Sequence, residues 1–187
     1  MTRIRPAAAP TRRALIVGVA ALAAARPAAA ASAAEIDADV DAAMRTLYAT
    51  VPGTEELAAK ARGVLIMPDV IKGGLIIGGS YGEGALRIGE VTDGYYSVAA
   101  ASIGYQIGVQ STSHALFFMT EAALEGFRRS KGWELGADAE FTVPGDGISL
   151  NVDSTSLKRP VIAVVFAQDG LLAGASLEGA KYTRIAR

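Results

Sequence analysis

The only histidine of the chain, His114, is the first residue to examine for chemistry. It precedes the apolar run 115–119, which is typical of a buried strand. A serine hydrolase would place such a histidine beside a nucleophilic serine, but the sequence has no Gly-x-Ser-x-Gly nucleophile elbow. One histidine and no cysteine also argue against a zinc site. We therefore predict that His114 is structural and hydrogen-bonded.

Two pairs of carboxylates, Glu134 with Asp138 and Asp138 with Glu140, have the spacing at which a general acid and base could be imagined. Their surroundings in residues 133–139 are typical of a solvated strand edge or loop instead. Aspartates later in the chain lack the regular ligand spacing of a calcium loop. The sequence therefore predicts no catalytic residue, no metal site, no cofactor and no enzyme.

Glycines dominate residues 73–89. A nucleotide-binding P-loop would end in Lys-Ser/Thr and open a helix, and the run 78–84 does neither. Each glycine costs a helix about 1 kcal/mol relative to alanine, so the segment favours strands. Two interpretations of these glycines stay open. They let a sheet curve, or they form a cleft where the backbone approaches a ligand.

Apolar spacing predicts an amphipathic helix over residues 35–50, and Thr54 can cap a second helix over 55–62. Thr120 can cap a third over 121–130. Tight turns are predicted at 92–94 and 168–170. Short strands are predicted at 63–67, 74–79, 84–90, 95–101, 105–111, 114–119, 139–143, 148–152, 161–166, 171–177 and 181–185.

Many short strands at regular spacing predict the fold class. We expect an α+β domain with a glycine-rich, strongly curved antiparallel sheet or partly closed barrel, covered by about three helices. The chain shows no internal repeat and no interdomain linker. A single domain over residues 34–187 is therefore predicted.

Residues 1–33 have the pattern of a signal peptide. Four arginines precede the apolar core 14–25, and Ala31-Ser32-Ala33 offers an A-x-A cleavage site. The core is shorter than the roughly 20 residues that span a bilayer. Arg12-Arg13 resembles a twin-arginine signal but lacks the usual Phe and Lys, so twin-arginine export and general secretion both stay open. We expect a periplasmic or secreted protein.

Removal of residues 1–33 would change the charge balance. The whole chain has 18 basic and 19 acidic residues, and the leader holds five arginines and no acid. The remaining chain thus carries 13 basic and 19 acidic residues, a net charge of −6. Such a balance argues against general nucleic-acid binding. Without cysteine there is also no disulfide and no lipid-modified thiol.

The chain resembles the SYLF lipid-binding domain family over roughly residues 45–186. The resemblance is carried by ordered blocks at 61–86, 94–110 (GYYSVAAASIGYQIGVQ), 115–133 and 170–185 (GLLAGASLEGAKYTRI). The family occurs in bacterial secreted proteins and is related to a yeast actin-binding domain. The resemblance implies a phospholipid-binding domain without enzymatic activity, attached peripherally to a membrane.

In eukaryotic relatives, the family implies phosphoinositide binding through a basic, amphipathic N-terminal segment. This chain departs from that pattern, because its first helix carries Glu35 and three aspartates, with Arg45 the only base before Lys60. Actin, the partner of a fungal relative, is not expected outside the cytoplasm. The alternative function is an envelope structural or stress protein that acts through a protein partner.

The expected ligand is the anionic head-group surface of a phospholipid membrane, where each nearby base contributes about 1 kcal/mol. Four or five converging bases would therefore support reversible binding. Bases around the first strands, the following glycines and bases at the end of the third helix are the candidate lipid-binding residues: Lys60, Arg62, Lys72, Gly78, Gly79, Gly82, Gly84, Arg128, Arg129 and Lys131. The group of Lys60, Arg62 and Lys72 is preferred if the fold gathers it. Further bases, at 158–159 and in 181–187, are treated as ordinary surface.

Overall fold

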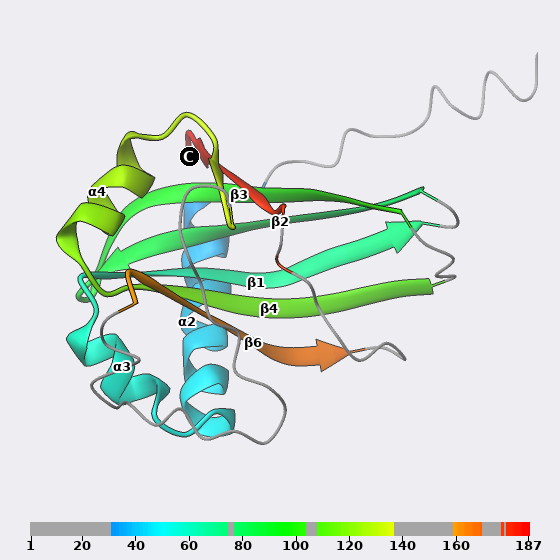
Figure 1. The fold of residues 1–187 in the computed structure, drawn as a ribbon. Helices are drawn as coiled ribbons and strands as arrows, with labels where there is room; N and C mark the ends of the chain where they lie inside the picture. Colours follow the sequence, from blue (N-terminus) through cyan, green and yellow to red (C-terminus); the bar gives the residue numbers. More distant parts are fainter. Residues whose placement is uncertain (1–30, 75–76, 104–107, 137–158, 170–176, 178) are drawn as a thin grey trace, which may run out of the picture. The chain divides into compact units, whose positions relative to one another are not determined.

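A computed structural model describes residues 31–74, 77–103, 108–136, 159–169, 177 and 179–187. In these residues three helices accompany a seven-stranded sheet (Figure 1). The helices are α2 (Ala33–Thr50), α3 (Thr54–Lys60) and α4 (Glu121–Arg129). The strands are β1 (Gly63–Gly74), β2 (Ile77–Ile88), β3 (Val91–Ile103), β4 (Gly108–Phe118), β5 (Trp133–Glu134), β6 (Val161–Asp169) and β7 (Lys181–Ile185).

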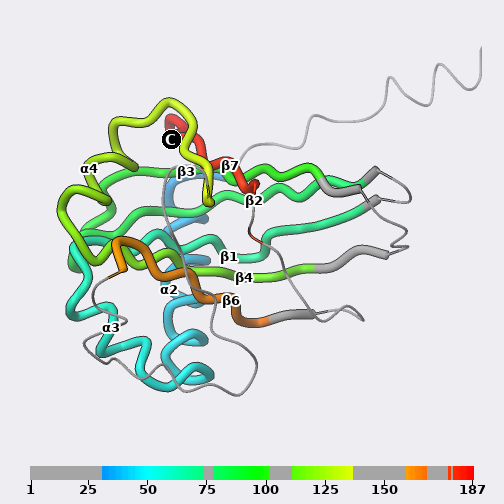
Figure 2. Tube along the Cα trace, viewed as in Figure 1, coloured from blue at the N-terminus to red at the C-terminus, as the bar shows by residue number. Residues whose placement is uncertain are grey.

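The strand order is β5-β7-β3-β2-β1-β4-β6, and every pair is antiparallel. The sheet curls strongly into a half-barrel, which confirms the predicted α+β class, the antiparallel curved sheet and the three helices. Strands β1, β2 and β3 form two consecutive hairpins, and the chain then crosses over so that β4 pairs with β1. These strands run on past α2 at the end of the sheet away from α4 (Figure 2).

Both faces of the sheet are packed where the helices lie. Side chains alternate along β1, so that Val64 and Ile66 join the core under α2 and α3. Leu65 and Met67 join the core on the other face, under α4. Phe127 of α4 stands in the middle of that second core and contacts the four aromatic rings of Tyr96, Phe118, Trp133 and Tyr182.

A β-bulge replaces the break that was predicted in β1. The strand predicted at 63–67 ends before Pro68-Asp69, but β1 continues through these residues, with Asp69 at φ +46° and a register shift against both neighbouring strands. The backbone N–H of Asp69 donates to the hydroxyl of Ser113 on β4 (3.2 Å). On the far side of β4, Ala167 of β6 also has a positive φ, +47°. The sheet is thus bulged on both sides of one strand, which sharpens its curl.

The predicted strands at 74–79 and 84–90 are one strand, β2, and those at 105–111 and 114–119 are one strand, β4. The polar residues Thr112 and Ser113 do not interrupt β4, because both are buried within it. The turn predicted at 92–94 is wrong: β2 and β3 are joined at Gly89-Glu90, where Gly89 supplies a φ of +61°.

The three helices are confirmed with shifted ends. Thr54 does not cap α3 from outside but begins it, and its hydroxyl donates to the carbonyl of Val51 (2.7 Å). Strand 181–185 is confirmed, and 161–166 extends through residues predicted as a turn. The strands at 139–143 and 148–152, and all but the last residue of 171–177, lie outside the described residues. None of the described helices is long and apolar enough to cross a membrane.

Ser32 caps α2 through a capping box. Its hydroxyl accepts from the backbone N–H of Glu35 (3.3 Å), and its own N–H donates to the Glu35 carboxylate (2.7 Å). Signal-peptide cleavage after Ala33 would remove this cap, whereas cleavage after Ala30 or Ala31 would keep it. Export itself stays a prediction, because residues 1–30 lie outside the described part of the chain.

In a chain that keeps residue 32, replacing Ser32 by alanine should lower the free energy of unfolding by about 1 kcal/mol, the usual effect of losing an N-cap hydroxyl. Urea unfolding followed by circular dichroism measures this loss. Ser32→Asp is the matched control, since aspartate caps as well as serine and should restore wild-type stability. Equal stability of the alanine and wild-type proteins would show that the capping box contributes nothing.

Candidate functional site

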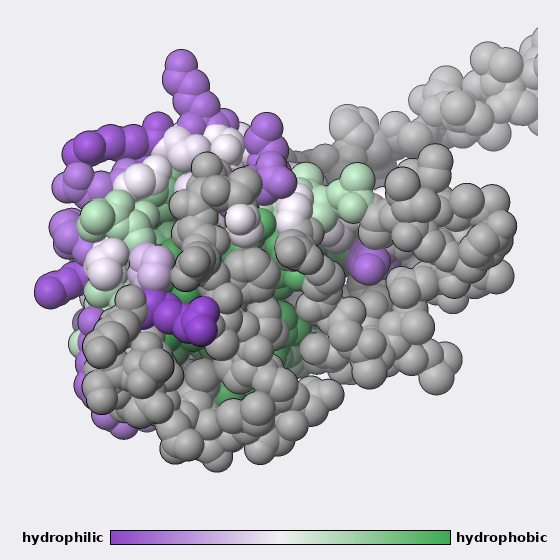
Figure 3. Space-filling view, in the orientation of Figure 1, coloured by the Kyte–Doolittle hydropathy of each residue, from purple (hydrophilic) through white to green (hydrophobic). Residues whose placement is uncertain are grey.

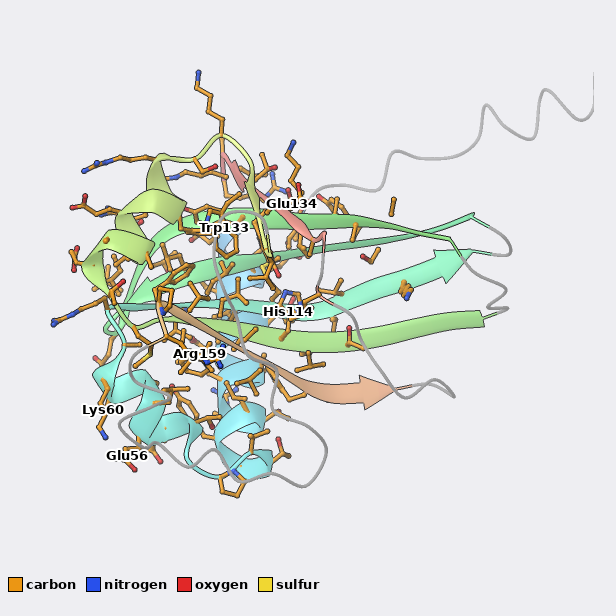
Figure 4. The ribbon with its side chains drawn as sticks, in the orientation of Figure 1. Glu56, Lys60, His114, Trp133, Glu134 and Arg159 are labelled. Atoms are coloured by element: carbon orange, nitrogen blue, oxygen red, sulfur yellow. The ribbon has the colours of Figure 1, made fainter. Side chains whose placement is uncertain are left out.

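The preferred basic group is not gathered in one place. Lys60, at the end of α3, forms an ion pair with Glu56 one turn earlier (2.7 Å; both are labelled in Figure 4). Arg62 is exposed just before β1. Lys72 lies ten residues further along β1, a strand distance of roughly 30 Å. Lys72 therefore belongs to a different part of the surface from Lys60 and Arg62.

The four candidate glycines fall into two pairs. Gly82 and Gly84 are buried where β2 runs beside the bulge of β1. A Cβ on Gly82 would lie 2.7 Å from the side chain of Val70, and a Cβ on Gly84 would collide with the Ile66 carbonyl. These two glycines let β2 pack closely against β1. Gly79 is exposed, and a Cβ there would meet nothing closer than 3.7 Å.

The second pair, Gly78 and Gly79, lies beside Lys72 at the end of the β1–β2 hairpin. The register sets Gly79 opposite Gly73, Gly78 opposite Gly74 and Lys72 opposite Ser80. Lys72 has no ion pair with any residue that the structure describes. The fold thus brings together three of the predicted lipid-binding residues.

Two residues that the sequence analysis missed complete this region. Ile71 and Tyr81 face each other across β1 and β2, with exposed fractions of 55% and 54%. We call Ile71, Lys72, Gly78, Gly79 and Tyr81 the strand-end surface. The Tyr81 hydroxyl donates to Glu83 (2.7 Å), and this hydrogen bond, with burial and the carboxylate charge, raises the pKa of the tyrosine.

A second group of bases meets where α4 ends beside β7. Arg128 donates twice to Asp93 (2.6 and 3.0 Å), and Arg184 donates to the Asp93 carbonyl (3.0 Å). Arg129 pairs with Glu125, and these side chains, apart from Asp93, line a shallow open depression.

Lys181 packs across Gly132, next to Lys131. We call the resulting group the α4–β7 basic face: Arg128, Arg129, Lys131, Lys181 and Arg184. Figure 3 shows hydrophilic side chains around α4 and the C-terminal strand.

Carboxylates neutralise much of this basic face. The positive charges of Arg128 and Arg129 are matched by Asp93 and Glu125, so these two predicted residues are not free cations. Lys131 has no ion pair within the described ranges. Lys181 and Arg184 could be found only from the sheet order, because they are about fifty residues away in sequence. The face combines both signs of charge rather than presenting a uniform positive surface.

Two aspartates of α2 bind residues of the sheet. Asp37 accepts from Thr92 and Tyr95 (2.8 Å each), and Arg87 pairs with Asp41 (2.7 Å). Burial alone would raise the pKa of Asp37, but the two hydrogen bonds and the charge of Arg87 outweigh it and lower the pKa below its usual value. This first helix is therefore held to the protein by its charged side as well as by its apolar side.

His114 is buried on the α4 side of the sheet (Figure 4). Its Nε2 and the Tyr182 hydroxyl are 2.8 Å apart and share a hydrogen bond, which confirms the prediction of a structural histidine. Its Nδ1 has no partner among the described residues. Burial lowers the pKa of His114 to about 4, so the ring is neutral at physiological pH.

Residues 99–185 match the family model described as Ysc84, Las17-binding protein actin regulator. The predicted SYLF resemblance is confirmed. The match begins within β3 and ends at the last residue of β7, so it includes β4, α4, β5 and β6. No curated protein matches the chain. SYLF domains are binding domains, with a lipid-binding or actin-binding role in the family.

Proposed function

We propose that this protein is an exported, non-enzymatic SYLF domain that binds phospholipid and associates peripherally with the cell-envelope membrane. The match of residues 99–185 to the SYLF family carries the proposal. The signal-peptide pattern of residues 1–33 supports work outside the cytoplasm, in the periplasm or as a secreted protein. In that setting the lipid role of the family applies, and actin is not expected as a partner.

An acidic protein can meet an anionic membrane only through a surface that is poor in carboxylates. Of the candidate cations, Lys60, Arg128 and Arg129 are paired with neighbouring acids, whereas Arg62, Lys72 and Lys131 have no ion pair in the described part of the chain. The head-group attraction in this proposal therefore comes from among these three bases, at about 1 kcal/mol for each base that reaches the membrane.

Co-sedimentation of the purified protein with lipid vesicles tests the function. We expect binding to vesicles of phosphatidylcholine with phosphatidylglycerol, and weaker binding to phosphatidylcholine alone. Because salt screens the attraction between a base and the head groups, raising the salt concentration should weaken binding without abolishing it. A protein that stays in the supernatant with every vesicle at low salt would contradict lipid binding.

A second candidate function is binding of a protein partner at the cell envelope. The mixed charges of the α4–β7 basic face favour it, because Arg128, Arg129 and Arg184 stand beside Asp93 and Glu125. Arginine is enriched at protein–protein interfaces, where its planar group makes several hydrogen bonds. This function becomes the preferred one if no vesicle is bound.

A further inference from the structure

We propose that the strand-end surface is the part of the molecule that enters the membrane. Ile71 and Tyr81 would lie in the interfacial layer, and Lys72 would contact an anionic head group. The proposal rests on the lipid-binding function above and gives it a location. It also places the contact on strands, at the opposite end of the sheet from the α4–β7 basic face (Figure 1).

The first observation is exposed apolar surface. Ile71 and Tyr81 are directly paired across two strands and each exposes more than half of its surface. The neighbouring positions on the same face are small: Tyr81 is opposite Ala99 on β3, and Gly79 is opposite Ala101, both exposed. The Ile71 and Tyr81 side chains therefore project beyond the small residues around them and are accessible to an apolar layer.

The second observation is charge. From residue 70 to 82 the only charged side chain is Lys72, and from 94 to 120 the sequence contains no Asp, Glu, Lys or Arg. Residues 70–82 and 94–120 together therefore carry one positive charge, whereas eight of the 19 acidic residues are on the three helices. In front of an anionic bilayer, this distribution turns the strand ends toward the lipid and the helices away from it.

The third observation is a polar border behind the apolar pair. Glu83 accepts from the Tyr81 hydroxyl and is ion-paired with Arg187, so its charge is neutralised. Asp69 accepts from the Ser111 hydroxyl (3.3 Å). The Tyr81 hydroxyl is thus hydrogen-bonded to a polar group while the ring is exposed to solvent. Tyrosines with an apolar ring and a bonded hydroxyl are typical of membrane–water interfaces.

The strand-end surface includes residues on both faces of the sheet. This arrangement favours a bilayer over a second copy of the chain as the binding partner. Consecutive residues on a strand point to opposite faces, so Lys72 projects away from Ile71. A second copy stacked on one face would cover Ile71 and Tyr81 and leave Lys72 outside the contact. A bilayer that receives the ends of the strands meets both faces at once.

The test compares the wild-type protein with the double variant Ile71→Ser/Tyr81→Ser in vesicle co-sedimentation. We expect the partition coefficient to fall at least about tenfold, since two half-exposed apolar side chains lose their transfer free energy. Val91→Ser is the matched control, because Val91 is 70% exposed at the other end of the β2–β3 hairpin. Tyr81→Phe should keep binding, because the ring rather than the hydroxyl enters the lipid.

Fluorescence gives a second readout in a protein whose single native tryptophan, Trp133, is 4% exposed. With brominated lipid in the vesicles, the added indole of Tyr81→Trp should be quenched and that of Val91→Trp should not. Wild-type protein supplies the Trp133 background.

Three results would overturn the proposal. Wild-type-like binding by the double variant would overturn the location and leave the lipid function standing. Loss of a dimer in the double variant, with vesicle binding intact, would assign the surface to a second copy. Failure of the wild-type protein to bind any vesicle would overturn both proposals.

Discussion

Replacing Gly84 by alanine should destabilise the protein by more than about 3 kcal/mol, above the usual range for an overpacked core. A Cβ at this position would overlap the carbonyl oxygen of Ile66 on β1 and lie 2.8 Å from the Met67 sulfur. A side chain can change its rotamer, but the carbonyl belongs to the backbone of a central strand. Strands β1 and β2 would have to move apart at this point, and the cores on both faces would loosen.

Thermal and urea unfolding, followed by circular dichroism, measure this effect. Gly79→Ala on the same strand is the matched control, since a methyl there would have its nearest neighbour at 3.7 Å. In a strand, alanine is favoured over glycine by roughly 0.5–1 kcal/mol, so the control should be neutral or slightly stabilised. If the two variants unfold alike, the close approach of β1 and β2 at Gly84 is not what stabilises the sheet.

Lowering the pH from about 6.5 toward 4 should destabilise the protein by about 3 kcal/mol through His114 alone. Burial holds its folded-state pKa at about 4, below its ordinary value of 6.5, so the unfolded chain binds a proton that the folded one does not. The contribution is therefore complete above pH 6.5 and lost as the pH falls to the folded pKa. No other histidine titrates in this window.

Chemical unfolding at a series of pH values measures the slope. The pKa values of the Glu35, Asp37 and Glu83 carboxyl groups are lowered from ordinary values of 4.5, 3.8 and 4.5, so the interval from pH 6.5 to 5 isolates the histidine. His114→Gln is the control: it is less stable at neutral pH, and its stability should not change across that interval. A wild-type protein with no slope between pH 6.5 and 5 would contradict a buried neutral ring.

The sequence predicts the helices well because their signals are local. Apolar spacing locates α2, and Thr120 caps α4 as expected, its hydroxyl accepting from the N–H of Ala123 (3.2 Å). The strands were predicted too short for a physical reason. Glycines and buried polar residues interrupt the alternation that marks a strand, although neighbouring strands still bond to the backbone through them.

The candidate site was predicted in part. Lys72, Gly78 and Gly79 lie close in sequence and join one hairpin, so their association follows from a single turn. The exposure of Ile71 does not follow from the sequence. In a strand without a bulge, the Ile71 side chain would point to the same face as Leu65 and Met67, into the core. The bulge at Asp69 shifts the alternation by one residue and turns Ile71 outward.

The strand order also determines the shortest fragment of the chain that can fold independently. Within residues 99–185 the strands β3 and β4 come first, but in the sheet β2 and β1 lie between them. A fragment cut at residue 99 would keep only one residue pair between β3 and β7, Ala99 with Lys181. It would keep β4 with β6 apart from them, with no described strand to bridge the gap. We expect such a truncation to aggregate, and an autonomous unit to start upstream of α2, where Ser32 still precedes the helix.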